Sequence, residues 1–585
     1  MFALRSIQSR MNDTFKSLDL ALHASIRDNN LTRLQLLIDA LSPADLNKRL
    51  RTNDGDWGMP LHVAVICNNP AAVDVLLSAG AKPLILRRIG DDASTPLSIA
   101  ARQGNRAILR QLWQHIDPDH HAGNYLGFQF CLVQAAMYGQ PLTIADLLDW
   151  WDGWSPKARE YALRWAAMRW KVYAVELLLS KLSFEQQLLD TALCDASDFK
   201  SLMVYETIVD YEGVDYFEQQ QLIALLVDAG ANPNATFNQE PLIQSAACSV
   251  NLVGALKALL QKGADPNATN QAGDSALHHL GFPVRLHQGS PETGLHETGI
   301  RLLLEHHASV RQQNKSGETP LHHAAAGSNV RILQLYLSAC PIEERDAFMR
   351  SKNNHGEMLL HFAAAGCNIE IIEYLLSHGG MEANINDVNS NGWTPLMCAL
   401  AQTASRHGDD GKQLSEVIPA ARLLLAHGAD PFVATAEGWT PLHCLALYFG
   451  KDLSGETAQL IDSLVLAGAD VNARALFPVQ DPSPGPLKSS DLMMFGWGHQ
   501  VEEIIKYPAT KGMMIRSGLT PLHFAAAHGA VGVVKALLRH GANPAAEDSS
   551  ETSPAKTAGE STRLECHRDA QDEIVALLIG AGGSY

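Results

Sequence analysis

Apolar residues along the chain fall into pairs of short stretches with helical spacing, and turns rich in Gly, Asn and Asp separate the pairs. The first stretch of a pair begins at a Thr-Pro-Leu step and continues into small alanines, as in 319–326. Thr can cap a free helical N–H and Pro fits the first helical position, so this step predicts a helix start. The second stretch, such as 371–376 or 533–538, ends at His-Gly, where Gly can adopt a left-handed cap. The pattern predicts units of turn, helix and helix.

These units recur with a period near 33 residues, which is the spacing between the turns at 230–234 and 263–267. Clear helix starts of the Thr-Pro-Leu-His type, or variants of it, lie near residues 60, 96, 241, 276, 320, 359, 395, 441 and 521. Weaker units fit at 22–23, 135–148, 166–179, 188–209 and 553–578. A fixed period of this kind indicates a repeat architecture in which neighbouring units share one core.

The Thr-Pro-Leu-His-x-Ala pattern at this period resembles the ankyrin repeat, and the resemblance covers most of the chain. It implies an all-α fold, an ankyrin-repeat solenoid of stacked helix pairs with hairpin-like loops and several insertions. Roughly 13 to 14 repeats fit, several of them degenerate. The resemblance also implies that the motif histidine, as in His322 and His443, binds loop backbone and ties adjacent turns together.

The pattern divides the chain into five stretches. Residues 1–110 hold N-terminal repeats with a degenerate cap, and 111–218 hold degenerate, tryptophan-rich helical repeats. Residues 219–473 are the central repeats. An insertion at 474–516 is proline-rich and then apolar, and 517–585 hold the C-terminal repeats and cap.

The tryptophan-rich stretch holds six of the ten tryptophans, and two interpretations of it stay open. Large side chains fill the less regular core of eroded repeats, or they form an aromatic surface that recognises a partner. Trp150, Trp151 and Trp154, which follow a predicted helix, are the candidates for such a surface.

A second candidate surface lies in the insertion, where Met493, Met494, Phe495 and Trp497 follow the proline-rich segment. A loop of this length is typically functional, and flexible Met-rich patches suit partner binding. The segment either packs back on a neighbouring repeat or inserts into a partner.

A third set precedes the Thr-Pro steps. The resemblance places Asn391, Trp393 and Trp439 at exposed loop tips, which commonly contact partners in such arrays. Packing between adjacent turns is the alternative for the two tryptophans.

Charge narrows the choice of partner. The chain carries 45 basic and 63 acidic side chains, a net charge of -18, which repels phosphate backbones and favours a protein partner with a basic surface.

No apolar run is long enough to cross a membrane. The nine cysteines are scattered and form no C-x-x-C pair, which predicts free thiols in a reducing compartment, cytoplasmic or nuclear. Residues 1–10 lack the apolar core of a secretion signal, and a short mitochondrial presequence is an open alternative.

No motif points to catalysis, since the chain has no phosphate-binding loop, no H-E-x-x-H and no G-x-S-x-G. A His/Asp-rich group at 115–121 resembles metal ligands, but its spacing favours a solvated helix terminus. We therefore expect no cofactor, no metal site and no catalytic residue.

Together these observations predict a non-enzymatic protein-protein interaction scaffold or adaptor. By resemblance to ankyrin proteins without other domains, it would regulate a partner or act as a transcriptional co-regulator through one. Two alternatives stay open: a pathogen or symbiont effector that engages host proteins, and an enzyme with an unrecognised site in 111–218 or 474–516. The sequence predicts no oligomeric state.

Overall fold

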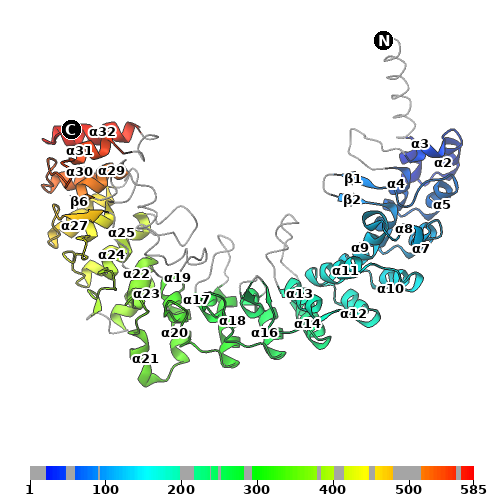
Figure 1. The fold of residues 1–585 in the computed structure, drawn as a ribbon, viewed down its shortest axis with the longest axis horizontal. Helices are drawn as coiled ribbons and strands as arrows, with labels where there is room; N and C mark the ends of the chain where they lie inside the picture. The colour runs from blue at the N-terminus through cyan, green and yellow to red at the C-terminus, as the bar shows by residue number, and fades with distance from the viewer. Residues whose placement is uncertain are drawn as a thin grey trace, which may run out of the picture. The chain divides into compact units, whose positions relative to one another are not determined.

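The computed structural model describes a chain of helices with three short two-stranded ladders, which confirms the predicted all-α class of stacked helix pairs with hairpin-like loops (Figure 1). Contacts divide it into two compact units, 1–265 and 266–585. The residues described are 21–47, 59–89, 92–197, 216–237, 239–247, 252–281, 293–378, 384–400, 414–446, 455–477, 516–561 and 568–585.

In the first unit the helices form two layers, and each helix packs on its neighbours in the same layer and on its partner in the other. The first layer comprises α4 (Pro60–Ile66), α6 (Pro96–Gln103), α9 (Phe130–Met137), α11 (Pro156–Met168), α13 (Gln186–Ser197) and α15 (Leu242–Ala247). The second layer comprises α2 (Leu31–Ile38), α5 (Pro70–Ser78), α7 (Arg106–Trp113), α10 (Pro141–Trp150), α12 (Val172–Lys181), α14 (Tyr216–Asp228) and α16 (Leu252–Gln261). Shorter elements are α3 (Pro43–Leu46), α8 (Pro118–His121), the π-helix η1 (Tyr125–Gln129), and the antiparallel pairs β1 (Arg87–Ile89) with β2 (Asp92–Ser94) and β3 (Thr236–Phe237) with β4 (Glu240–Pro241).

The second unit repeats this arrangement. Its first layer comprises α17 (Ala276–Gly281), α19 (Pro320–Gly327), α22 (Leu359–Ala365), α24 (Pro395–Leu400), α26 (Pro441–Leu445), α29 (Pro521–His528) and α31 (Pro554–Gly559). Its second layer comprises α18 (Thr293–Glu305), α20 (Val330–Ser338), α23 (Ile369–Ser377), α25 (Leu414–Ala426), α27 (Glu456–Leu466), α30 (Val531–Arg539) and α32 (Arg568–Gly580). An extra helix, α21 (Ile342–Met349), accounts for the long spacing before α22, and β5 (Ala475–Phe477) pairs with β6 (Arg516–Leu519).

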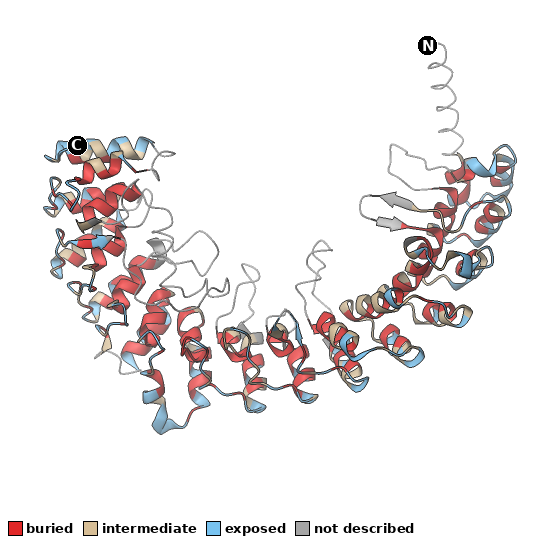
Figure 2. Ribbon diagram, viewed as in Figure 1, coloured by how far each residue is buried: buried red, intermediate tan, exposed pale blue. Residues whose placement is uncertain are grey.

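The helix starts form as the Thr-Pro steps predict. Thr95, Thr440 and Thr520 have extended backbones just before a proline at the first helical position. At α6 the Thr95 hydroxyl accepts from the Ser98 N–H at 3.1 Å, and the Ser98 hydroxyl accepts from the Thr95 N–H at 2.8 Å. Such reciprocal caps satisfy two amides that the helix leaves free. Buried residues then gather where the two layers meet (Figure 2).

Two of the predicted boundaries fall inside helices. A weak unit is predicted at 188–209, whereas α13 packs on α14, which begins at Tyr216 and spans the expected boundary between 218 and 219. The helix pair is interrupted by extra residues, so a fixed period placed the second helix too early. The boundary between 110 and 111 likewise falls inside α7.

The insertion begins and ends in one ladder, because Phe477 pairs with Arg516 and Ala475 with Leu519. Residues 478–515 lie outside the described residues. The four candidates Met493, Met494, Phe495 and Trp497 are among them, so their role as a partner-binding patch stays a prediction.

Asparagine side chains link the turns of successive repeats. The Asn386 amide donates to the Gly428 carbonyl at 3.1 Å, and its oxygen accepts from the Asp430 N–H at 2.7 Å. Each such amide therefore satisfies one backbone acceptor and one backbone donor of the next turn, as a neighbouring strand would. The same pair of bonds forms at Asn47, Asn234, Asn267 and Asn472.

Replacing Asn386 with Ala should lower the free energy of unfolding of the second unit by about 1–2 kcal/mol, because two hydrogen bonds at a partly solvated site are lost. Urea denaturation followed by circular dichroism measures this loss. Asn391→Ala is the matched control, since Asn391 is exposed and should cost less than about 0.5 kcal/mol. Equal losses in the two variants would show that the inter-turn bonds contribute nothing.

Candidate protein-binding surface

Buried histidines hold the loops of the second unit in place. The Thr440 N–H donates to Nδ1 of His443 at 3.2 Å, and Nε2 of His443 lies 3.3 Å from the Leu519 carbonyl of the next unit. His523 makes the corresponding contact with the Thr552 carbonyl at 3.1 Å. Since Nδ1 accepts a hydrogen bond from a backbone N–H, Nε2 carries the imidazole hydrogen and donates a hydrogen bond to the carbonyl of the next repeat. The predicted structural role of the motif histidine is confirmed at His443 and His523, whereas Nε2 of His322 makes no such bond.

Burial also keeps these imidazoles neutral. It lowers the pKa of His322, His361, His443 and His523 to about 4, because the charged form would lose its hydration. All four side chains are buried. At pH 7 all four are neutral, and His361, His443 and His523 link neighbouring loops through Nε2.

Two buried carboxyl groups occupy equivalent loop positions and differ in their pKa. Burial raises the pKa of Glu357 to about 7, although the Asn353 and Asn389 amides donate to it at 2.9 and 3.1 Å. Burial acts in the same direction on Glu318, but a hydrogen bond from Nε2 of His323 at 3.0 Å helps to bring its pKa down to about 2. The imidazole at Glu318 explains the difference. Both carboxyl groups are buried at the loops.

The tryptophan-rich stretch packs around Phe128, which is fully buried. Its ring centroid lies 5.4 Å from Trp113, 5.1 Å from Trp151 and 5.7 Å from Trp154. Trp154 is only 2% exposed, and its Nε1 donates to the Leu147 carbonyl. A buried, hydrogen-bonded Trp154 favours the interpretation of this stretch as an irregular core.

The other two tryptophans of this group lie at the edge of the cluster. Trp150 and Trp151 are half-buried, and Nε1 of Trp151 donates to Asp119 at 3.0 Å. Asp117 accepts from the His120 N–H and begins α8, so this part of the His/Asp-rich group is a helix terminus, as predicted. Partner binding by Trp150 and Trp151 stays a prediction, and Trp154 is too buried to take part.

The three loop-tip candidates differ in exposure. Asn391 is exposed and Trp393 is half-buried. The expected exposure of Trp439 is wrong, because the side chain is only 2% exposed, its Nε1 donates to the Leu476 carbonyl, and its ring lies 4.9 Å from Phe524. The strand β5 of the next loop covers this indole. The motif alone does not encode that contact.

A cation–aromatic cluster on the first unit was not identified from the sequence. Nζ of Lys157 lies 5.0 Å from the ring centroid of Tyr125 and 5.7 Å from that of Tyr161. Lys157 and Tyr161 are four residues apart on α11, and this spacing is the signal that could have indicated the cluster.

A depression of about 600 Å³ among α27, α30 and α32 is lined mainly by small and apolar residues, with Lys535 and Arg539 at its side. Within the described ranges, no three His, Cys, Asp or Glu side chains gather where they could hold a metal ion. In the same ranges, no helix has both the length and the apolar character needed to span a membrane.

Family models match five stretches of the second unit. A model described as ankyrin repeats (3 copies) matches 332–409, and one described as ankyrin repeats (many copies) matches 296–335. A single ankyrin repeat model matches 391–436, 437–476 and 517–549.

Curated proteins are similar over parts of the chain. The mitochondrial disaggregase of Bos taurus is 33% identical over 135 residues, 23% of this chain and 18% of the relative. The Caenorhabditis elegans ankyrin repeat and KH domain-containing protein mask-1 is 26% identical over 264 residues, 42% of this chain and 10% of the relative. The NF-kappa-B inhibitor alpha of Mus musculus is 39% identical over 94 residues, 15% of this chain and 29% of the relative. The match thus spans less than a third of each relative.

Proposed function

The chain is an ankyrin-repeat protein, and we propose that it is a non-enzymatic scaffold or adaptor that binds other proteins through its loops and first-layer helices. The observation that carries this proposal is the set of histidine and asparagine bonds that fix each loop to the next, such as His443 with the Leu519 carbonyl. A surface fixed before binding loses little conformational freedom when a partner arrives. Such a surface suits recognition of a folded or extended protein segment.

Charge supports a basic partner for the second unit. Residues 266–585 carry 34 acidic and 22 basic side chains. An excess of acidic groups attracts a basic protein and raises its association rate, and it repels nucleic acid.

A regulatory role is the finer part of the proposal. One relative is named as an inhibitor of NF-kappa-B, which supports repeats of this type serving in a protein that controls another protein. We accordingly propose a regulator, or a transcriptional co-regulator acting through a bound partner, in the cytoplasm or nucleus.

The test is affinity purification from the native cell with quantitative mass spectrometry. Wild type is compared with the double variant N391A/W393A and with Ile342→Ala, a control on the exposed side of α21. We expect a stoichiometric partner that the control retains and the double variant loses. If no protein is enriched above background with wild type, the scaffold proposal is wrong.

A further inference from the structure

Positive charge is concentrated on two first-layer helices of the first unit, α6 and above all α11, with the turns that follow them. Six Lys or Arg side chains and one acid, Glu160, lie on three segments of the first layer. These segments are α6, η1 with α9, and α11, each with the turn that follows it: residues 96–105, 125–139 and 156–171. The whole chain has a net charge of -18, so this local excess runs against the overall charge.

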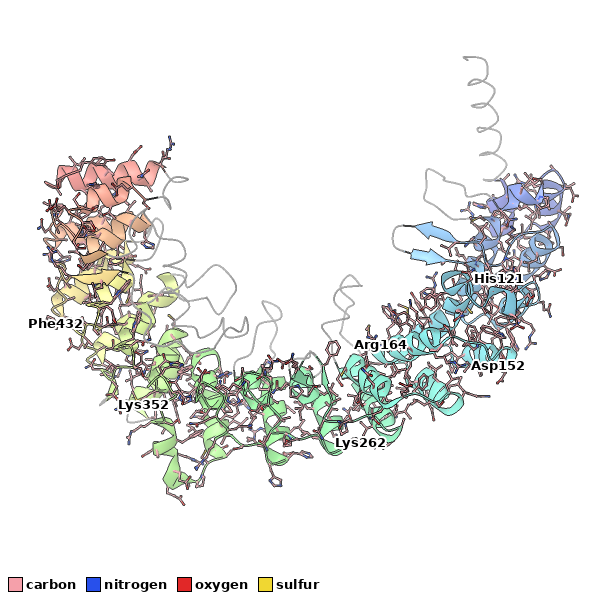
Figure 3. The ribbon with its side chains drawn as sticks, viewed as in Figure 1. His121, Asp152, Arg164, Lys262, Lys352 and Phe432 are labelled. Carbon is pink, nitrogen blue, oxygen red and sulfur yellow. The ribbon has the colours of Figure 1, made fainter. Side chains whose placement is uncertain are left out.

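Helix α11 brings several of these groups to one side. Its buried residues include Ala158, Ala162 and Ala166, whereas Lys157 is exposed and Tyr161 is partly exposed. Residues four apart on a helix share a face, so Lys157 and Tyr161 lie one turn apart on the side away from the core. Arg164 follows on α11 and is labelled in Figure 3.

The far ends of the helices carry a second part of the surface. Tyr138, which is 39% exposed, lies with its ring centroid 5.6 Å from Cζ of Arg102 and 5.3 Å from Cζ of Arg169. The aliphatic part of Lys171 runs beside Gly139, where a Cβ would meet its Cδ at 2.8 Å. The Tyr138 ring after α9 therefore contacts one arginine in the last turn of α6 and one just after α11, and Lys171 lies beside the adjacent Gly139.

Carboxylates neutralise only part of this charge. Asp195 binds Nε of Arg164 at 2.7 Å, and Glu160 lies 3.6 Å from the same guanidinium. Lys157 and Arg102 form no ion pair with the described residues. They stand over tyrosine rings, a weaker arrangement that leaves their charge available to a ligand.

We propose that this surface, formed by Arg102, Tyr125, Tyr138, Lys157, Tyr161 and Lys171, binds an acidic segment of a partner protein. The inference rests on the proposed function, since it specifies one partner-binding surface of the scaffold. Carboxylates of the segment would bind the exposed Lys157 and the partly exposed Arg102 and Lys171. Its apolar side chains would pack along the edges of the tyrosine rings, since the cations cover the ring faces.

Geometry favours an acidic protein segment over single-stranded nucleic acid. Nucleic acid binding of this kind uses open aromatic faces on which bases stack. Here Lys157 covers Tyr125 and Tyr161, and two arginines cover Tyr138.

The length of α11 sets the spacing of the acidic groups. Lys157 lies in the first turn of α11 and Lys171 lies in the turn that follows its end at Met168, so about one helix length, about 20 Å for 13 residues, separates them. An extended peptide covers that distance in about six residues. The segment therefore needs two acidic groups or clusters about six residues apart, with apolar residues between them.

The test uses the full chain and a fluorescein-labelled 12-residue peptide with Asp and Glu at both ends and Leu and Phe in the centre. Fluorescence anisotropy should detect binding that weakens at higher salt, because exposed charge pairs are screened. The variant R102Q/K157Q should bind at least tenfold more weakly. The control R33Q/K82Q removes the same charge from exposed positions elsewhere in the first unit and should bind as wild type does.

The remaining comparisons decide the proposal. A peptide with Asn and Gln in place of the acidic residues should not bind. The inference is overturned if wild type does not bind the acidic peptide, if both variants lose it equally, or if a 12-nucleotide single-stranded RNA binds more tightly. A native partner captured by wild type despite such a result would leave the scaffold proposal intact and remove only this surface.

Discussion

Lowering the pH from 7 to 5 is expected to destabilise the second unit steeply. Burial holds the pKa of His322, His361, His443 and His523 near 4, against 6.5 for an exposed imidazole, and lowers that of His278 further. Unfolding lets each imidazole take up a proton throughout this interval. The stability from these depressed pKa values is complete above pH 6.5 and is lost as the pH falls towards 4.

Glu357 acts in the opposite direction. Burial raises its pKa to about 7, so the folded state holds a proton that the unfolded state releases, and this contribution to stability decreases as the pH rises from 4.5 through 7. Five histidines take up protons on unfolding and one carboxyl group releases one, so unfolding takes up about four protons in total between pH 5 and 6. The free energy of unfolding should therefore change by about 5 kcal/mol per pH unit.

Urea denaturation at several pH values, followed by circular dichroism, measures this slope. His523→Gln should reduce the uptake by about one proton. The control His378→Gln changes an exposed residue and should leave the slope as it is. A free energy of unfolding that is constant between pH 7 and 5 would contradict the role assigned to the buried histidines.

Replacing Phe128 with Ala should lower the free energy of unfolding of the first unit by about 3–5 kcal/mol. The side chain is fully buried, and its loss leaves a cavity between Trp113, Trp151 and Trp154. Urea denaturation followed by tryptophan fluorescence reports on the same cluster.

The matched control is Leu142→Ala on α10, where the side chain is 62% exposed and its loss should cost less than about 0.5 kcal/mol. A loss below about 1 kcal/mol for Phe128→Ala would mean that the tryptophan cluster is not a core. The interpretation as a recognition surface would then be favoured.

The sequence predicted those features that depend on a few adjacent residues. A Thr-Pro step contains its own cap and its own first helical residue, so the starts of α6, α26 and α29 could be located without tertiary information. The motif histidine was interpreted correctly for the same reason, because its Nδ1 partner lies three residues earlier.

Features that depend on distant residues were not predictable in this way. Trp439 is buried by Leu476, which is 37 residues further along the chain. More residues separate α14 from α13 than the 33-residue period allows, so the period could not locate α14. The cluster of Lys157 with Tyr125 joins helices of two adjacent repeats, α11 and η1. Only the pair on α11, Lys157 and Tyr161, is close enough in sequence to be recognised.

The central claim is that partners bind the loops and first-layer helices of a preformed array. Hydrogen exchange of the full chain with and without a purified captured partner tests it most directly. The account predicts added protection in first-layer helices and their loops, such as α11 or 384–400, and little change in second-layer helices such as α12 and α23. Protection confined to the second layer, or no change with partner bound, would contradict it.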